Sequence, residues 1–133
     1  MPDKDPPLNY LDRSIIHKTY QLYVVLYACI ARFPKKDRHS LGQKCDNSTL
    51  EILEYFFHAQ SQQGSRRMAF LQRADIRLKI LQTLIRVAYD IKALDQRSYI
   101  SLQKDIIEIG KMLGGWIKST HVKNSTHTEY GAE

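Results

Sequence analysis

Basic residues recur at every seventh position near the end of the chain, at Arg97, Lys104, Lys111 and Lys118. On a helix a seven-residue repeat drifts by only about 20° per heptad, so these four side chains form one stripe about 60° wide. Such a row of cations can follow the phosphates of a nucleic acid. Alternatively, Glu108 forms ordinary i,i+4 and i,i+3 ion pairs with Lys104 and Lys111 on a solvated face. The spacing predicts a basic surface and leaves these two interpretations open.

Further basic residues fall on the other predicted helices, and together they exceed what pairing with acids requires. Arg73 and Arg77 align with apolar residues of their helix, so they either line an interior channel of an oligomer or pair with acids of a neighbouring subunit. The full set of predicted binding residues is Lys35, Lys36, Arg38, Arg73, Arg77, Lys79, Arg86, Lys104, Lys111 and Lys118.

Motifs of catalysis and of metal or nucleotide binding are missing from the sequence. The five histidines form no HxxxH or HExxH pattern, and no Gly-rich phosphate loop or G-x-S-x-G motif occurs. Some small helical ribonucleases use an arginine and a nearby histidine, as Arg32 and His39 are spaced, but Pro34 interrupts this pair. We therefore expect no catalytic residue, no metal site and no cofactor, and the protein is not predicted to be an enzyme.

Composition indicates one folded domain with a polyanionic partner. The chain has 133 residues, of which 43% are hydrophobic and 26% charged, with a net charge of +6. No run of 18 or more apolar residues and no signal peptide is recognisable, so we expect a cytoplasmic protein that does not enter a membrane. Cys29 and Cys45 lie among apolar residues and are expected to be buried free thiols.

Helical periodicity covers most of the chain. We expect helices over residues 14–33, from Pro34 to about residue 60, over residues 66–92 and, with Asp95 as N-cap, to the end of the domain. Residues 61–65 form a turn by composition. Short connections favour antiparallel neighbours, so the predicted fold class is all-α, an up-down antiparallel four-helix bundle. The bundle domain is predicted to span residues 13–119, between a flexible N-terminal lead (1–12) and a flexible C-terminal tail (120–133).

Apolar residues at helical spacing identify the expected core. On the last helix they are Leu102, Ile106, Ile109, Leu113 and Trp116, and on the second they are Leu41, Cys45, Thr49, Ile52, Leu53 and Phe56. On the first helix they are Ile16, Tyr20, Tyr23, Tyr27 and Ile30, so we expect buried tyrosine rings whose hydroxyls reach the rim. Gly110 and Gly114 lie beside the apolar face of the last helix and would let a neighbouring backbone approach closely.

The third helix is apolar over more of its circumference than one bundle needs. One side carries Ile76, Ile80, Leu84, Val87 and Ile91, and a second group carries Leu71, Leu78, Leu81, Ile85 and Ala88. Large exposed apolar patches are uncommon on monomers, so this surplus predicts a subunit interface in a homo-oligomer. The alternative is a helix that is more central than its neighbours.

Several segments of the chain resemble the accessory variability determinant of diversity-generating retroelements. They are Phe33-Pro34-Lys35-Lys36-Asp37-Arg38, Leu41-Gly42-Gln43-Lys44, Leu84-Ile85-Arg86-Val87-Ala88 and EIGKMLGGWI at residues 108–117. The resemblance covers roughly residues 20–119, and the last segment is its most specific part. The same small four-helix family includes proteins encoded in intervening sequences of 23S ribosomal RNA genes. The Gly-Gly-Trp ending favours the retroelement branch.

The resemblance implies a barrel-like pentamer of four-helix protomers with basic surfaces. Such a protein binds a dedicated reverse transcriptase and the retroelement's template RNA, or DNA, and supports mutagenic cDNA synthesis without catalysing a reaction. It also implies basic residues at the positions of Arg86 and Lys111, and it places Lys35 and Arg38 in the matching Phe-Pro segment. The alternative function is a structural or ribosomal-RNA-linked bundle with general affinity for nucleic acid.

Overall fold

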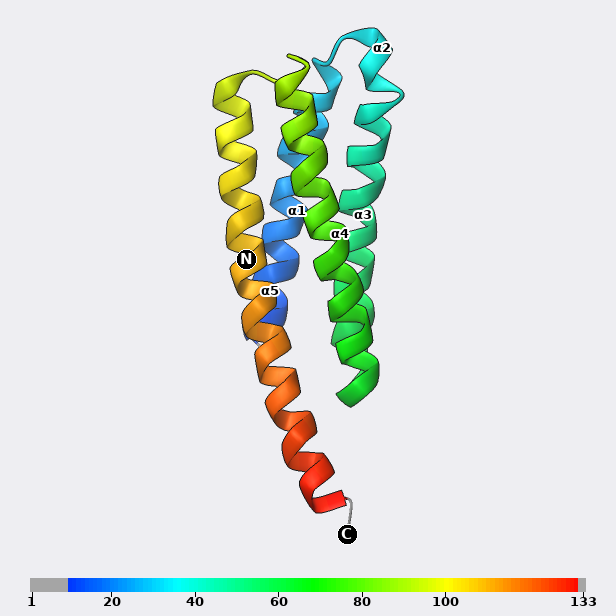
Figure 1. Cartoon of the computed structure of the whole chain (residues 1–133), viewed down its shortest axis with the longest axis vertical. Helices are drawn as coiled ribbons and strands as arrows, with labels where there is room; N and C mark the ends of the chain where they lie inside the picture. Colours follow the sequence, from blue (N-terminus) through cyan, green and yellow to red (C-terminus); the bar gives the residue numbers. More distant parts are fainter. Residues whose placement is uncertain (1–9, 132–133) are drawn as a thin grey trace, which may run out of the picture.

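The computed structural model describes residues 10–131, which form a helical bundle without strands (Figure 1). Four long helices run alternately up and down the bundle: α1 (Tyr10–Ala31), α3 (Leu41–Ser61), α4 (Gly64–Asp90) and α5 (Gln96–Gly131). A four-residue helix, α2 (Lys35–Arg38), lies between α1 and α3. Both α1 and α4 pack against α3 and α5. The predicted four-helix bundle is therefore confirmed.

The second predicted helix is divided in two, because the helix is interrupted at His39 and Ser40 between α2 and α3. Gly42 explains how α3 begins so close to α1. A Cβ atom built on Gly42 would lie 2.8 Å from Cγ2 of Ile30 and 3.3 Å from the carbonyl oxygen of Asp37. Only a glycine therefore allows the first turn of α3 to pack directly against the end of α1. The expectation of one continuous helix from Pro34 was wrong.

The connection between α4 and α5 confirms Asp95 as the N-cap of the last helix. The backbone N–H of Ser98 donates a hydrogen bond of 2.7 Å to Oδ1 of Asp95. This backbone hydrogen bond is the main reason that the pKa of Asp95 is lowered. Lys92, just past the end of α4, adopts the left-handed conformation with a φ of 67° and helps to end that helix.

Helix covers part of both terminal segments that were expected to be flexible. Residues 1–9 of the expected lead lie outside the described residues, and α1 begins at Tyr10. The segment expected to be a tail from residue 120 onward continues α5 as helix to Gly131. Figure 1 shows these last turns extending beyond the other helices. Thr120 is buried, so contact with the bundle continues past the predicted boundary at residue 119.

The core contains the apolar residues predicted for α5 and most of those predicted for α3. Leu102, Ile106, Ile109, Leu113 and Trp116 are all buried on α5. On α3 the buried members are Cys45, Thr49, Ile52 and Phe56, while Leu41 and Leu53 are half-buried. The rings of Phe56 and Trp116 pack with centroids 6.1 Å apart. Cys29 and Cys45 are buried free thiols, and burial is the main cause that raises the pKa of Cys45 to about 12.

The core face of α1 differs from the predicted one. The buried apolar residues are Ile15, Leu22, Leu26, Cys29 and Phe33, the last just beyond the helix. Tyr20 is 55% exposed and Tyr27 is 63% exposed, so the expectation that these rings are buried was wrong. The two candidate faces are offset by about one residue, or 100°. The leucine face packs inward because burying an aliphatic side chain removes no hydrogen-bonding group from water. Burying a tyrosine would desolvate its hydroxyl, so Tyr20 and Tyr27 remain exposed.

The surplus apolar surface predicted for α4 is present. Leu71, Leu78, Leu81, Ile85 and Ala88 are buried in the bundle. Another group remains exposed and is called here the α4 apolar stripe: Ile76, Ile80, Val87 and Ile91. The alternative, that this helix is simply more central than its neighbours, does not account for this group, which the protomer leaves exposed.

Gly110 and Gly114 do not serve close packing inside the protomer. A Cβ atom on Gly110 would lie 3.7 Å from Cδ2 of Leu78, which is ordinary van der Waals contact. A Cβ atom on Gly114 would have no neighbour within 4 Å. Within the protomer the expected close approach of a neighbouring helix at these two glycines is therefore wrong, whereas Gly42 is a position where close packing does need a glycine.

Candidate nucleic-acid interface

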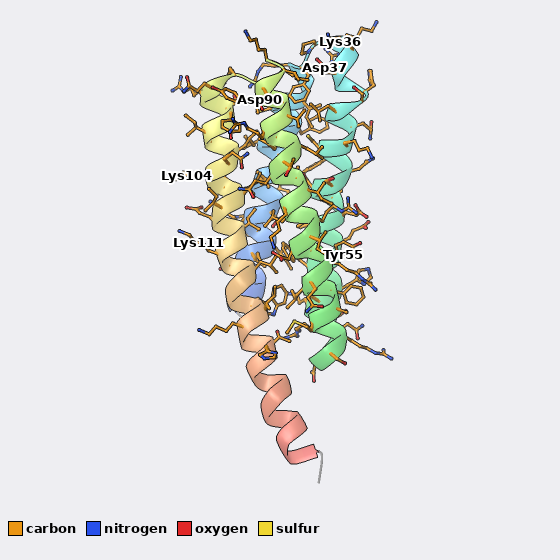
Figure 2. All side chains as sticks on the ribbon, in the orientation of Figure 1. Lys36, Asp37, Tyr55, Asp90, Lys104 and Lys111 are labelled. Carbon is orange, nitrogen blue, oxygen red and sulfur yellow. The ribbon has the colours of Figure 1, made fainter. Side chains whose placement is uncertain are left out.

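The basic stripe of α5 lies on the outer surface of the bundle, opposite the buried face of the helix. Its members, Arg97, Lys104, Lys111 and Lys118, are all exposed. Figure 2 shows Lys104 and Lys111 projecting outward from the same side of α5. The predicted apolar face is therefore buried and the predicted basic residues are exposed, but Ile100 and Ile107 are also exposed on the side of the basic stripe.

Glu108, the acid expected to neutralise this stripe, pairs with a different helix. Its Oε1 lies 2.6 Å from Nζ of Lys18 on α1, and Oδ1 of Asp105 lies 3.5 Å from the same nitrogen. The hydrogen bond from Lys18 is the main cause that lowers the pKa of Glu108, and the hydrogen bond to Glu108 raises that of Lys18. Lys104 and Lys111 act on Glu108 only through longer-range attraction. Among residues 14–121, neither lysine forms an ion pair with an acid.

A second group of exposed cations lies at one end of the bundle, on α2. Lys35, Lys36 and Arg38 are all exposed, and Figure 2 shows Lys36 pointing away from the bundle. Nη2 of Arg38 donates a hydrogen bond of 3.3 Å to the carbonyl oxygen of Phe33, which holds the guanidinium beside the end of α1. The remaining guanidinium donors of Arg38 are available to a ligand.

The predicted cations Lys79 and Arg86 on α4 each have an acidic neighbour one turn away. Nζ of Lys79 lies 2.9 Å from Oδ2 of Asp75. Nε of Arg86 donates to both carboxylate oxygens of Asp90, at 3.1 and 3.2 Å. These exposed pairs are held weakly in water, so both cations can exchange their partner for a stronger anion.

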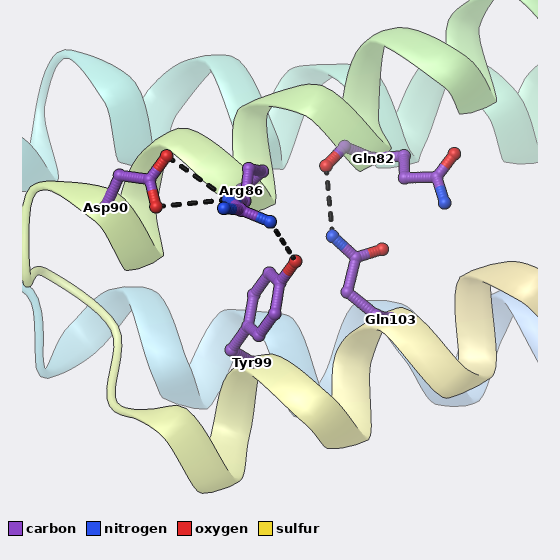
Figure 3. Close-up of polar contacts among 5 residues, drawn as sticks. All are labelled: Gln82, Arg86, Asp90, Tyr99 and Gln103. Carbon is purple, nitrogen blue, oxygen red and sulfur yellow. Dashed lines mark hydrogen bonds and ion pairs between the residues drawn. The ribbon is translucent and has the colours of Figure 1, made fainter.

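Arg86 also connects α4 to α5 in the groove between the two helices (Figure 3). Its Nη1 lies 3.5 Å from the hydroxyl of Tyr99, whose ring stacks on that of Tyr89 with centroids 4.4 Å apart. The Tyr99 contact, followed by Asp90, raises the pKa of Arg86. Farther along the groove, Nε2 of Gln103 donates a hydrogen bond of 3.1 Å to the carbonyl oxygen of Gln82 (Figure 3). The guanidinium is thus oriented while its side chain stays exposed.

Arg77 contacts α3, and Arg73 contacts an aromatic ring of its own helix. Nε of Arg77 lies 3.1 Å from Oε1 of Glu51 on α3. The guanidinium of Arg73 lies 5.5 Å from the ring centroid of Phe70. Of the two options left open by the sequence, Arg77 pairs with an acid, but with one of its own chain and not of a neighbour.

The ten predicted residues do not converge on one site. Two exposed groups have no acidic partner among the described residues, one on α2 and one along α5. They are separate from the predicted cations of α4, most of which pair with acids.

Sequence reasoning missed Lys18 and Arg67, which stabilise the fold. Arg67 donates to the carbonyl oxygen of Ala59 at 2.8 Å and covers the ring of Trp116. It also missed the exposure of Tyr20 and Tyr27, because the spacing of the tyrosines is also typical of a buried face.

The described residues offer no arrangement typical of a metal site. No group of three or more histidine, cysteine, aspartate or glutamate side chains among them is placed to hold a metal ion. Arg32, from the weighed ribonuclease pattern, turns back to its own helix, where Nη1 donates to the carbonyl oxygen of Ala28 at 3.4 Å. In the same part of the chain, no helix has the length and apolar character required to cross a membrane.

Comparison with known proteins identifies one family. A family model described as bAvd-like matches residues 14–120, which include all four long helices in whole or in part, and both exposed basic groups. No curated protein matches the chain.

Proposed function

The chain belongs to the bAvd-like family of accessory variability determinants, and we propose that it is a non-catalytic accessory protein of a diversity-generating retroelement. In this role it binds the retroelement's reverse transcriptase and template RNA in the cytoplasm and supports mutagenic cDNA synthesis. The family match over residues 14–120 is the observation that carries this proposal. The exposed cations give the proposal a physical basis on this chain.

The basic stripe of α5 and the cations of α2 are the proposed contacts with RNA. A cation already paired with an acid must give up that partner before it can bind a phosphate, whereas Lys104 and Lys111 have no such competitor among the described residues. Each lysine that replaces counterions on the RNA contributes to binding in a salt-dependent way. Arg86 is the proposed bidentate contact, either with phosphate or with a carboxylate of the reverse transcriptase.

We propose that the protomers assemble into a homo-oligomer, with the family resemblance favouring a barrel-like pentamer. The α4 apolar stripe supports this assembly, because Ile76 is 60% exposed and Ile91 is 50% exposed. Apolar side chains so aligned on one helix are stabilised when a second copy removes them from water. The same assembly would place several basic stripes around one particle and so multiply the contacts with a single RNA.

The test of this function uses the reverse transcriptase and template RNA encoded beside the gene. We expect the chain to co-purify with the enzyme and to increase cDNA synthesis on the template RNA when added to it. An RNA of the same length without the template region serves as control. Failure to bind either component at low salt, with the protein folded and oligomeric, would exclude the proposed role.

A further inference from the structure

A small cavity lies between α1 and α3, next to α2, and it is separate from the α5 stripe and the Arg86 groove. Its volume is about 280 Å³. This is slightly below the roughly 300–1,000 Å³ of sites for drug-sized ligands, so a single planar ring system suits it better than a large cofactor. Its apolar floor includes Ile30 and the backbone of Gly42, and its polar wall includes Tyr27, Asp46, Arg38 and His39.

The aromatic part of this cavity is Tyr27, whose ring is 63% exposed. Its centroid lies 6.0 Å from that of Tyr23, at an interplanar angle of 55°, so the two rings are tilted and Tyr23 does not cover the Tyr27 face by stacking. An exposed tyrosine face beside an apolar floor is a suitable surface for an unstacked base, because every base has a π-face. Gly42 lies at this floor, where its lack of a side chain lets α3 pack directly against Ile30.

The polar part of the cavity combines one acid with two basic side chains. Asp46 lies on α3 and is half-buried. It interacts with the Tyr23 hydroxyl, and this interaction is the main cause that raises the pKa of Tyr23. A carboxylate only accepts hydrogen bonds, so a ligand next to it must present N–H or O–H donors. Gln43, which also lines the cavity, donates a hydrogen bond of 3.2 Å from its Nε2 to Oδ1 of Asn47, and its carbonyl oxygen is a further acceptor.

Basic side chains surround the mouth of the cavity, where the phosphates of a bound nucleotide would lie. Arg38 and His39 line the wall, and Lys35 and Lys36 are exposed on the same short helix as Arg38. The phosphates on either side of an inserted base would therefore meet the cations of α2. Single-stranded RNA is commonly recognised in this way, with the base stacked on an aromatic ring and its Watson–Crick edge hydrogen-bonded.

We propose that this cavity binds one unpaired guanine of a single-stranded RNA. Guanine presents two neighbouring donors, N1–H and the 2-amino group, to the carboxylate of Asp46, while Tyr27 stacks on the base. Adenine and cytosine present one amino donor and uracil one imino donor, so they satisfy this carboxylate less well. The inference rests on the proposed function, since it concerns how the RNA is recognised, and it adds a base-selective contact to the phosphate contacts of the basic stripe.

The first experiment compares short single-stranded oligouridines that differ at one central nucleotide, with affinity measured by fluorescence anisotropy. We expect guanosine to bind about tenfold more tightly than adenosine or uridine, the size expected for one net charge-assisted hydrogen bond. Inosine lacks the 2-amino group and presents N1–H as its one donor, so its affinity should fall to about that of adenosine and uridine. Equal affinity for all four oligonucleotides would overturn the inference.

The second experiment uses variants with matched controls. Tyr27→Ala should lower the affinity for the guanosine oligonucleotide by roughly 5- to 150-fold, the range reported for loss of base stacking on an aromatic ring. Tyr27→Phe keeps the ring and should bind normally. Tyr20→Ala removes another exposed tyrosine of α1, 55% exposed and outside this cavity, and should also bind normally. Asp46→Asn should abolish the preference for guanosine but leave the affinity for oligouridine unchanged.

Circular dichroism and light scattering on each variant separate these outcomes from changes in folding and assembly. If Tyr27→Ala dissociates the oligomer without lowering the affinity of the protomer, the cavity belongs to a subunit contact and the inference is wrong. If the wild-type protein binds all the oligonucleotides equally through their phosphates, the guanine site fails and the proposed function stands. If it binds none of them at low salt, both proposals fail.

Discussion

Glu108 of α5 forms its ion pair with Lys18 of α1, with 2.6 Å between Oε1 and Nζ, although two lysines lie one turn away on its own helix. The side chain of Lys18 is only 28% exposed, so this ion pair links α1 and α5 at the edge of the core and is not a fully solvated surface pair. Because the acid turns toward α1, the outer face of α5 keeps its positive charge. The stability of the bundle and the charge of its surface are thus linked through one carboxylate.

Replacing Lys104 and Lys111 together with alanine should weaken RNA binding far more than folding. Exposed surface substitutions usually change the free energy of unfolding by at most about 0.5 kcal/mol each. Each lost phosphate contact should lower the slope of log K against log salt concentration by roughly 0.7 to 0.9. The measurement is RNA affinity at several salt concentrations, beside urea unfolding.

The matched control for this prediction is the double variant Lys104→Arg, Lys111→Arg, which keeps both charges. It should bind RNA with the wild-type salt slope. An unchanged slope for the alanine double variant would show that the α5 stripe is only solvated surface.

The comparison of α5 with α1 shows where sequence reasoning succeeds and where it does not. On α5 most large apolar residues lie opposite the lysines, so one orientation of the helix buries the first group and exposes the second, and it was predicted correctly, although Ile100 and Ile107 remain exposed beside the lysines. On α1 both the tyrosine face and the leucine face have helical spacing. Which of the two faces is buried depends on how well their side chains pack against α3 and α5. That choice is made by tertiary packing, as is the pairing of Glu108 with Lys18 across two helices, and neither is encoded in local spacing.

Arg86→Ala should lower affinity for RNA or for the reverse transcriptase more than Lys111→Ala does, because a planar guanidinium can bind an anion through two donors. Arg86 is an exposed side chain, so thermal unfolding should change little. Arg86→Lys keeps the charge and should restore only part of the affinity. Asp90→Asn removes the competing carboxylate at 3.1 Å and should maintain or increase affinity. Full binding by Arg86→Ala would remove this residue from the interface.

The Lys18–Glu108 pair predicts a specific dependence of stability on pH. The pKa of Glu108 is lowered in the folded state, chiefly by Lys18, so its contribution is present above its ordinary value of 4.5 and is lost as pH falls through the folded value. The difference in unfolding free energy between the wild type and Lys18→Met should therefore be constant near neutral pH and should shrink in acid. Urea unfolding at a series of pH values measures it.

Lys44→Met is a suitable control, because Lys44 is an exposed lysine of α3 that forms no ion pair with the described acids. Its unfolding free energy relative to wild type should show no such change in acid. The same acid dependence in both variants would mean that the effect comes from net charge and not from this pair.

Ile76→Asp should dissociate the oligomer while the protomer stays folded. Ile76 is 60% exposed on the α4 apolar stripe, so the bundle itself does not depend on it, whereas burying a new carboxylate in a subunit interface is costly. Size exclusion with light scattering should report several times the 15.5 kDa protomer for the wild type and a smaller species for the variant. Gln82→Asp, at an exposed position of α4 about 120° around the helix from Ile76, should assemble normally. A variant Ile76→Asp of wild-type size would place the interface elsewhere.

Two glycine-to-alanine substitutions should have opposite effects on stability. Gly42→Ala places a Cβ atom 2.8 Å from Ile30 and 3.3 Å from the backbone oxygen of Asp37, so α3 must move and the variant should lose about 1–3 kcal/mol. Gly114→Ala meets no neighbour within 4 Å and should gain roughly 0.5–1 kcal/mol, because alanine costs less conformational entropy in a helix.

Urea unfolding of both variants, at a concentration where the protein is dissociated, measures these changes in the protomer. Light scattering at higher concentration then shows whether each variant still assembles. A loss of protomer stability in Gly114→Ala would contradict the open space around that residue. If instead the protomer is stabilised but assembly or reverse transcriptase binding is lost, the backbone of a partner occupies the space that Gly114 leaves open, which would explain why the helix keeps a glycine at an exposed position.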